Sequence, residues 1–267
     1  MSRKDKYYDW YRAFLQMMMS KGVMTGQEVF RGVKSICQAY KESRDFPSSL
    51  NINDSGEIAE MIELFLEETN KALKQINLQI SKTQDEIKTD GKYTQYYVIH
   101  QTYENDQLAK LQKTYSEPEM EWLRLVAEHL VDQEDKLAGE TALINLCRNG
   151  GNNSSKKKLN VTEADRALAT FLADGYLLKV KQGKKSFKYG LGARFLVEME
   201  RWLRDTFGED VWRCGKCGKV GMVGVQCSQP RCGATFHLYC VDTGTKDPKC
   251  TKCKTPLKIE GVATKRN

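Results

Sequence analysis

The chain has 267 residues, of which 40% are hydrophobic and 29% are charged, and its formal net charge is +7. This size suits two or three small domains better than one large core. No apolar run approaches the 18 or so residues of a membrane span, and the first residues lack the apolar stretch of a signal peptide. We therefore expect an intracellular protein with no membrane partner.

The positive charge is concentrated in one part of the chain. Residues 156–194 contain 10 Lys and Arg against 3 Asp and Glu, whereas residues 1–155 contain 19 against 24. A contact with a polyanion is therefore expected in the middle segment first.

Residues 1–102 show three apolar stripes at helical spacing, followed by two β-prone stretches at about 76–87 and 93–101. Thr89-Asp90-Gly91 is a turn signal between the two stretches. Three helices and a hairpin predict a first winged-helix domain. The stripes are Trp10, Tyr11, Phe14, Leu15 and Met18; Val29, Val33, Ile36, Cys37 and Tyr40; and Ile58, Met61, Ile62, Phe65 and Leu66.

Residues 103–190 repeat this order. A capping box at Ser116 to Glu119 opens one helix, and a shorter helix is expected at 139–148. Thr162 to Asp165 is the predicted cap of the next helix. A β-hairpin then turns at Gln182-Gly183-Lys184. We predict a second winged-helix domain here.

The hairpin of this second domain is rich in lysine. Its side chains could neutralise phosphates of DNA, or they could form a solvated edge that discourages strand pairing. The sequence favours neither interpretation over the other. The candidates are Lys179, Lys181, Lys184, Lys185 and Lys188.

A connecting helix is predicted over 191–210, with its apolar face expected to be buried against the winged helices or against another protein. That face consists of Phe195, Leu196, Met199, Trp202 and Leu203.

Seven of the nine cysteines fall between residues 214 and 253, which indicates metal binding in a chain without a secretory signal. With one histidine they form four pairs and supply the eight N/S donors that two tetrahedral zinc ions need. Cys37 and Cys147 lie outside this module and are expected to be buried in apolar cores. The pairs are Cys214 and Cys217, Cys227 and Cys232, His237 and Cys240, and Cys250 and Cys253.

The spacing alone leaves open whether the pairs are used in sequence or interleaved. The ligand order resembles variant RING and PHD modules, and the resemblance implies that pairs one and three share one zinc ion while pairs two and four share the other. The first site would be Cys214, Cys217, His237 and Cys240, and the second Cys227, Cys232, Cys250 and Cys253. PHD fingers usually carry a tryptophan shortly before the last cysteine pair, where this chain has Asp247-Pro248-Lys249, so we favour RING.

A RING domain supplies no catalytic side chain and acts by docking a ubiquitin-conjugating enzyme. In that family the docking face usually has an apolar residue between the first two cysteines, a proline after the seventh and a cation after the eighth. This chain has Lys216, Thr251 and Lys254 at these positions. Lys216 and Lys254 are therefore docking candidates, and we expect a ubiquitin ligase that is weak without a partner.

Nearly the whole chain resembles the RING-bearing non-SMC element subunit of the SMC-five/six complex. The resemblance rests on the stretch from Phe14 to Val23, the run from Leu191 to Glu200 and the eight-ligand module. It implies two tandem winged helices before the RING, a MAGE-type partner that raises ligase activity, and a kleisin subunit. It also implies a nuclear, chromosome-associated role in DNA repair and recombination, with DNA contacted through the complex. The resemblance also suggests that parts of Met17 to Met19 and of the helix at 191–207 could form docking surface for the partner.

The sequence thus predicts an α+β chain, mainly helical, with two tandem winged helices followed by a two-zinc variant RING of RING-CH or PHD-like ligand order. The expected domains are 1–102, 103–190, the connecting helix 191–210, the zinc module 211–257 and a flexible tail 258–267. Two alternatives remain open: an architectural subunit with an inactive RING, and a PHD-like chromatin reader.

Overall fold

The computed structural model describes residues 7–47, 49–102, 115–149, 158–183, 186–241 and 248–258. About half of these residues are helical, and the rest form short strands and loops. The chain divides into two compact units, residues 1–83 with 95–106 and residues 84–94 with 107–267. None of the described helices is long and apolar enough to cross a membrane.

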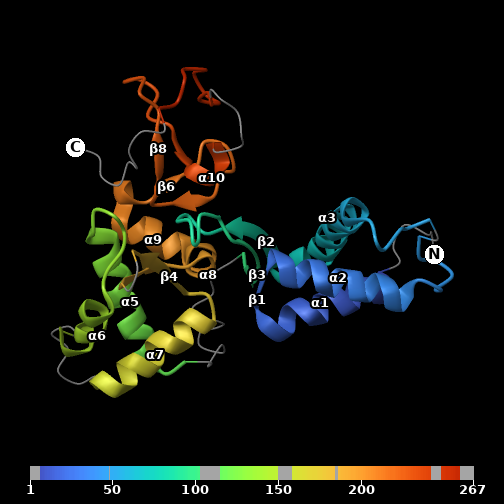
Figure 1. Ribbon diagram of the computed structural model, residues 1–267, viewed down its shortest axis with the longest axis horizontal. Coiled ribbons are helices and arrows are strands. Elements are labelled where there is room, and N and C mark those ends of the chain that lie inside the picture. Colours follow the sequence, from blue (N-terminus) through green and yellow to red (C-terminus); the bar gives the residue numbers. More distant parts are fainter. Residues whose placement is uncertain are drawn as a thin grey trace. The chain divides into compact units, whose positions relative to one another are not determined.

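The first unit combines three helices with a three-stranded sheet (Figure 1). The expected helices and hairpin are present, but the sheet has an additional short strand that pairs antiparallel with the last one, with Val23 opposite Val98. The strand order is β1-β3-β2. The elements are α1 (Asp9–Lys21), β1 (Val23–Thr25), α2 (Gly26–Tyr40), α3 (Ser55–Leu73), η2 (Lys74–Ile76), β2 (Leu78–Gln84) and β3 (Gln95–Gln101).

The predicted apolar stripes form the core of this unit. Phe14, Val29 and Phe65 are fully buried, and Cys37 lies among them as expected. Met18 is also fully buried, whereas Met19 is 59% exposed, so the methionine run is split between core and surface. The helices therefore pack through the faces that their 3.6-residue periodicity marks.

The second unit begins with helices and a hairpin in the predicted order: α5 (Glu117–Asp132), α6 (Glu140–Asn149), α7 (Val161–Ala173), β4 (Leu177–Gln182) and β5 (Ser186–Leu191). The hairpin pairs Leu177 with Leu191 and Gln182 with Ser186. Ala138 bridges to Tyr189 on the outer side of β5. The Asn160 side chain, not the predicted run from Thr162, caps α7 by accepting from the Glu163 amide. Asn160 and Glu163 form a capping box, a local signal that the prediction from Thr162 overlooked.

The connecting helix is two helices rather than one, α8 (Ala193–Glu198) and α9 (Glu200–Phe207) (Figure 1). The helical path breaks at Met199, which has φ −105° and ψ 16°. Phe195, Leu196 and Leu203 are buried in the core that also contains Trp122 and Phe171. The apolar face that sequence periodicity marked is therefore packed within its own unit.

The cysteine-rich module consists of short elements joined by tight loops, and most of its cysteines lie on these loops. The elements are η3 (Gly208–Asp210), β6 (Trp212–Arg213), β7 (Val220–Gly221), β8 (Gly224–Gln226), β9 (Thr235–His237) and α10 (Leu238–Val241). The strands pair as β6 with β7 and β8 with β9. Val211, Val220 and Met222 are buried in the same core as α5, α7 and α8. The module is thus joined to the helices by packing as well as by the chain.

Residues 84–94, between β2 and β3, belong to the second unit. The predicted turn lies here: Asp90 and Gly91 have φ 50° and 76°, and Thr89 and Lys92 exchange two backbone hydrogen bonds. Consecutive positive φ values are typical of the tight turns that close hairpins.

Candidate metal centre

The structure brings the eight predicted donor side chains together in two groups of four. Within each group the donor atoms all lie within 4.8 Å of one another. The groups interleave along the chain: the first contains Cys214, Cys217, His237 and Cys240, and the second contains Cys227, Cys232, Cys250 and Cys253.

The first group is assembled from both small hairpins and α10. Cys214 follows β6, His237 ends β9, and Cys240 lies one helical turn further on. The His237 Nδ1 atom lies 3.3 Å from Cys217 Sγ and 3.8 Å from Cys240 Sγ. His237 Nε2 lies 2.8 Å from the Val220 carbonyl oxygen, which leaves Nδ1 facing the sulfur atoms.

The second group is held by two tight turns. The Sγ atoms of Cys227 and Cys253 are 3.4 Å apart, and those of Cys232 and Cys250 are 3.6 Å apart. The Lys254 amide donates to the Cys250 carbonyl, and Lys254 adopts a left-handed φ of 64° to close this turn.

These distances fit zinc better than disulfides. A disulfide places its sulfur atoms about 2.05 Å apart. Four ligands at about 2.3 Å around a tetrahedral zinc ion lie about 3.8 Å from one another, close to the separations seen in both groups. Thiolate and imidazole are also the donors that zinc favours. Since four protein donors fill each site, a metal ion bound there would have no position left for a substrate.

The thiols of the two groups share their protons unequally: the pKa of Cys227 is raised to about 12, chiefly by burial, whereas that of other thiols is lowered. Hydrogen bonds with Thr255 lower the pKa of Cys253 to about 6. Hydrogen bonds with Cys217 and Cys240 lower the pKa of Cys214 well below its ordinary value. A thiolate is the form that binds metal, so Cys214 and Cys253 are the donors already disposed to be deprotonated in the two groups.

Glu86, from the segment between β2 and β3, lies behind the first group and was missed by sequence reasoning. It is 4% exposed, and its carboxylate accepts from the backbone amides of Met222 at 3.0 Å and Val223 at 3.4 Å. Its Oε1 atom lies 3.5 Å from His237 Nε2. Burial raises the pKa of Glu86 to about 7, against the opposing effect of His237. These partners are more than 130 residues away in sequence, and no local motif signals such a contact.

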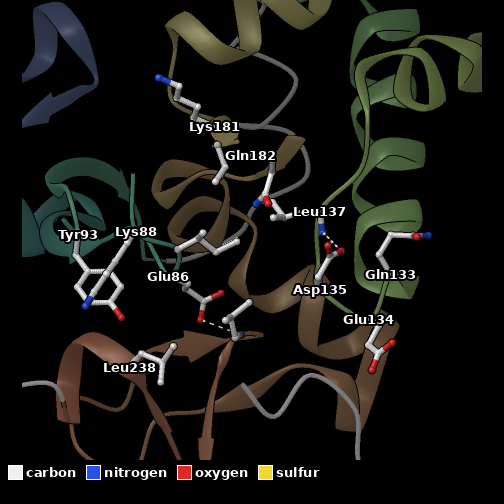
Figure 2. A pocket seen from close by; sticks show the side chains of 13 residues that line it. Glu86, Lys88, Tyr93, Gln133, Glu134, Asp135, Leu137, Lys181, Gln182 and Leu238 are labelled. Carbon is white, nitrogen blue, oxygen red and sulfur yellow. Dashed lines mark hydrogen bonds between the residues drawn. The ribbon is translucent and has the colours of Figure 1, made fainter. Parts of the chain in front are cut away.

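An open pocket of about 880 Å³ adjoins Glu86, bounded by residues 86–93, the end of α5, the end of β4 and the cysteine-rich module. Figure 2 shows Glu86 directed toward the backbone of the cysteine-rich module, with Lys88 and Tyr93 side by side on the same segment. The pocket has an apolar part, formed by Ile87, Leu137, Val180, Val223 and Leu238, and a rim of both charge signs.

Comparison with known proteins shows the family to which the chain belongs. The family model described as "Nse1 non-SMC component of SMC5-6 complex" matches residues 11–199. The chain belongs to this family. The resemblance drawn from the sequence is therefore confirmed. The match ends before the first cysteine of the module, so the metal assignment rests on the geometry of the clusters.

Similar proteins from other organisms agree with the Nse1 family. "Non-structural maintenance of chromosomes element 1 homolog" from Rattus norvegicus is 28% identical over 250 residues, which are 92% of this chain and 82% of that protein. The Homo sapiens protein of the same name is 26% identical over 92% of this chain and 82% of that protein. A solved structure named "Nse1-Nse3-Nse4 complex" matches with a TM-score of 0.67 at 24% identity, over 96% of this chain and 100% of the matched one. This likeness shows a shared fold.

The docking candidates lie on the cysteine loops of this Nse1-family chain. Both Lys216 and Lys254 are exposed. The Lys216 ammonium donates to the Cys240 carbonyl at 2.7 Å, and the Lys254 ammonium donates to the Thr251 carbonyl at 3.2 Å. The Thr251 hydroxyl donates to the Gly215 carbonyl at 2.9 Å and so joins the first and last cysteine loops. The two lysines therefore lie close to the hydrogen bond that joins the first and last cysteine loops.

The lysine hairpin is partly engaged within the chain. Lys188 forms an ion pair with Asp135, and the Lys179 ammonium lies 4.5 Å from the centre of the Phe187 ring. Lys181 is exposed at the pocket rim. Lys184 and Lys185 lie outside the described residues.

Proposed function

We propose that the chain is a subunit of an SMC5-6 complex whose zinc module is a variant RING and acts as a ubiquitin ligase once a MAGE-type partner is bound. Residues 1–102 and 103–190 would be tandem winged helices, joined through residues 191–210 to the module at 211–257. Family membership and the helix, helix, helix, hairpin order of both parts support this architecture. The role would be nuclear and chromosome-associated, in DNA repair and recombination.

The interleaving of the two donor groups carries the proposal. Because the second cysteine pair lies between the two pairs of the first group, neither group can form without folding the intervening loops. Two bound zinc ions would supply the folding free energy of a module that has few large apolar side chains, and would do no chemistry on a substrate. This is the RING arrangement, in which loops rather than reactive groups face the partner.

Activity in a RING comes from holding a charged conjugating enzyme in a reactive geometry. The hydrogen bond between Thr251 and Gly215 brings the first and last cysteine loops into one surface, and Lys216 and Lys254 lie beside this hydrogen bond. Lys254 would be the cation of the docking face. Lys216 replaces the usual apolar contact, which supports a weak intrinsic interaction that a partner must strengthen.

The neighbouring solved structure is named for Nse1, Nse3 and Nse4. We extend that assembly to this chain, with the MAGE-type subunit and the kleisin as its partners. A direct DNA contact through the β4–β5 hairpin would depend mainly on Lys181, Lys184 and Lys185, since Lys179 and Lys188 already interact within the chain.

A purely architectural role is the second candidate. The observation that favours it is the bond from the Lys216 ammonium to the Cys240 carbonyl, which holds a polar group where a ligase RING usually has an apolar one.

The test is ubiquitin transfer by the purified chain, with and without its MAGE-type partner. We expect transfer mainly in the presence of the partner, and a reduction of about 10-fold in Lys254→Ala, the effect of losing one charge-assisted contact of about 1.4 kcal/mol. Lys249→Ala, which removes another exposed lysine of the same module, is the matched control and should keep full activity. If no transfer occurs with a broad panel of conjugating enzymes while two zinc ions stay bound, the ligase proposal is wrong and the architectural role is supported instead.

A further inference from the structure

The segment between β2 and β3 contacts the first donor group from two directions. Glu86 reaches the backbone of the loop after β7, as described above. Tyr93 packs against Tyr239 with ring centroids 5.8 Å apart, and Tyr239 in turn stacks on the His237 ring at 4.6 Å. Both contacts converge on the one histidine among the eight donors.

A metal-binding histidine needs its second ring nitrogen held, because that bond fixes the tautomer and the ring orientation. Here the Val220 carbonyl accepts from His237 Nε2, so Nδ1 remains available among the sulfur atoms. Val220 lies in β7, and Met222 and Val223 are the first two residues after this strand. The carboxylate of Glu86 binds the amides of these two following residues and so fixes the position of the Val220 carbonyl.

The negative charge of Glu86 favours metal binding by His237, as its position does. A carboxylate buried to this degree is costly unless its hydrogen bonds are satisfied, and the two amides satisfy them. With Oε1 3.5 Å from His237 Nε2, the carboxylate also favours the positive charge that an imidazole gains when Nδ1 binds a metal ion.

We propose that Glu86 is a positioning residue for the first zinc site, holding the loop from Val220 to Val223 and thereby the His237 ring in its metal-binding orientation. The segment at 84–94 then controls how tightly one of the two zinc ions is held, and the second site is independent of it. This inference rests on the proposed assignment of zinc to both donor groups.

Zinc affinity of the full-length chain, measured by competition with a chromogenic chelator, tests the proposal. Glu86→Ala should weaken one of two zinc ions by about 10- to 100-fold, the usual effect of losing an outer partner of a metal-binding histidine. Glu86→Gln keeps an oxygen acceptor for the amides but loses the charge, so it should weaken the same ion by a smaller factor. The control is Asp90→Asn, which removes an exposed carboxylate from the same segment and should leave both affinities unchanged.

Cadmium-113 NMR of the exchanged protein assigns the effect to a site. The wild-type chain should give two resonances, one for the site with three thiolates and an imidazole and one for the site with four thiolates, and the Glu86 variants should move only the former. A role confined to packing would lower stability without this selective change. Equal affinities in wild type and Glu86→Ala, or equal weakening of both ions, would overturn the proposal. A wild-type chain without two bound zinc ions would instead refute the zinc assignment itself.

Discussion

At the residue scale, single side chains fix the ends of elements through hydrogen bonds that sequence patterns partly reveal. Thr25 and Glu28 form a capping box at the start of α2, and Lys21 adds an ion pair at 2.7 Å. The hydrogen bond from Lys21, followed by that from the Thr25 amide, lowers the pKa of Glu28 to about 2. A carboxylate stabilised in this way favours the folded state only while it is ionised.

We predict that Glu28→Gln destabilises the first unit by up to about 1 kcal/mol at neutral pH. Because the folded-state pKa is lowered, this stability is present above about pH 4.5 and is lost as the pH falls toward 2. Urea unfolding at a series of pH values should therefore show wild type and variant converging in acid. Glu60→Gln, an exposed carboxylate on α3, is the control and should show no such convergence. A difference that persists at pH 2 would contradict this account.

The candidate site was predictable from sequence at the level of its donors and not at the level of their support. Cysteine and histidine are few, and their spacing is local, so eight positions could be named. Glu86 is one of 35 acidic residues, and its importance depends on a contact between segments far apart in the chain. Only the fold identifies it.

At the element scale, the connection between the β4–β5 hairpin and α8 depends on a close backbone approach. A Cβ atom on Gly192 would lie 2.3 Å from the Gly175 carbonyl oxygen, and the Gly192 amide donates to Tyr176. The φ of Gly192 is −83°, so the constraint is one of space rather than of backbone conformation.

Gly192→Ala should destabilise the second unit by about 1–3 kcal/mol, because backbone must move to admit the methyl group. Gly139 precedes α6, and a methyl group added to it would have no atom within 4 Å, so Gly139→Ala should change stability by no more than about 0.5 kcal/mol. Thermal unfolding of both variants makes the comparison. Equal stability of the two variants would show that the close approach relaxes at little cost.

Helices with strong apolar periodicity were predictable, and their interruptions were not. The break at Met199 occurs without proline or glycine there, and α8 and α9 share an apolar face that a single helix would also present. Strand β1 has three residues, too few for a periodic signal, and it is defined by its pairing with β3. Both features arise from tertiary contacts.

At the scale of the whole molecule, family membership was recognisable from sequence because the resemblance extends over nearly the full chain. The division into domains at 102, 190 and 210 stays a prediction. The buried residues Val211, Val220 and Met222 show that the cysteine-rich module shares the core of α5, α7 and α8. Sequence reasoning treated this module as separate because its cysteine spacing is self-contained.

The central claim is that two zinc ions are held by interleaved pairs, and native mass spectrometry of paired-ligand variants tests it most directly. The wild-type chain should carry two zinc ions. Cys214→Ser combined with His237→Ala damages only the first site, so one ion should remain, whereas Cys214→Ser combined with Cys232→Ser damages both sites and should leave none. The reverse result, no zinc in the first double variant and one ion in the second, would show that the pairs are used in sequence and would contradict the account.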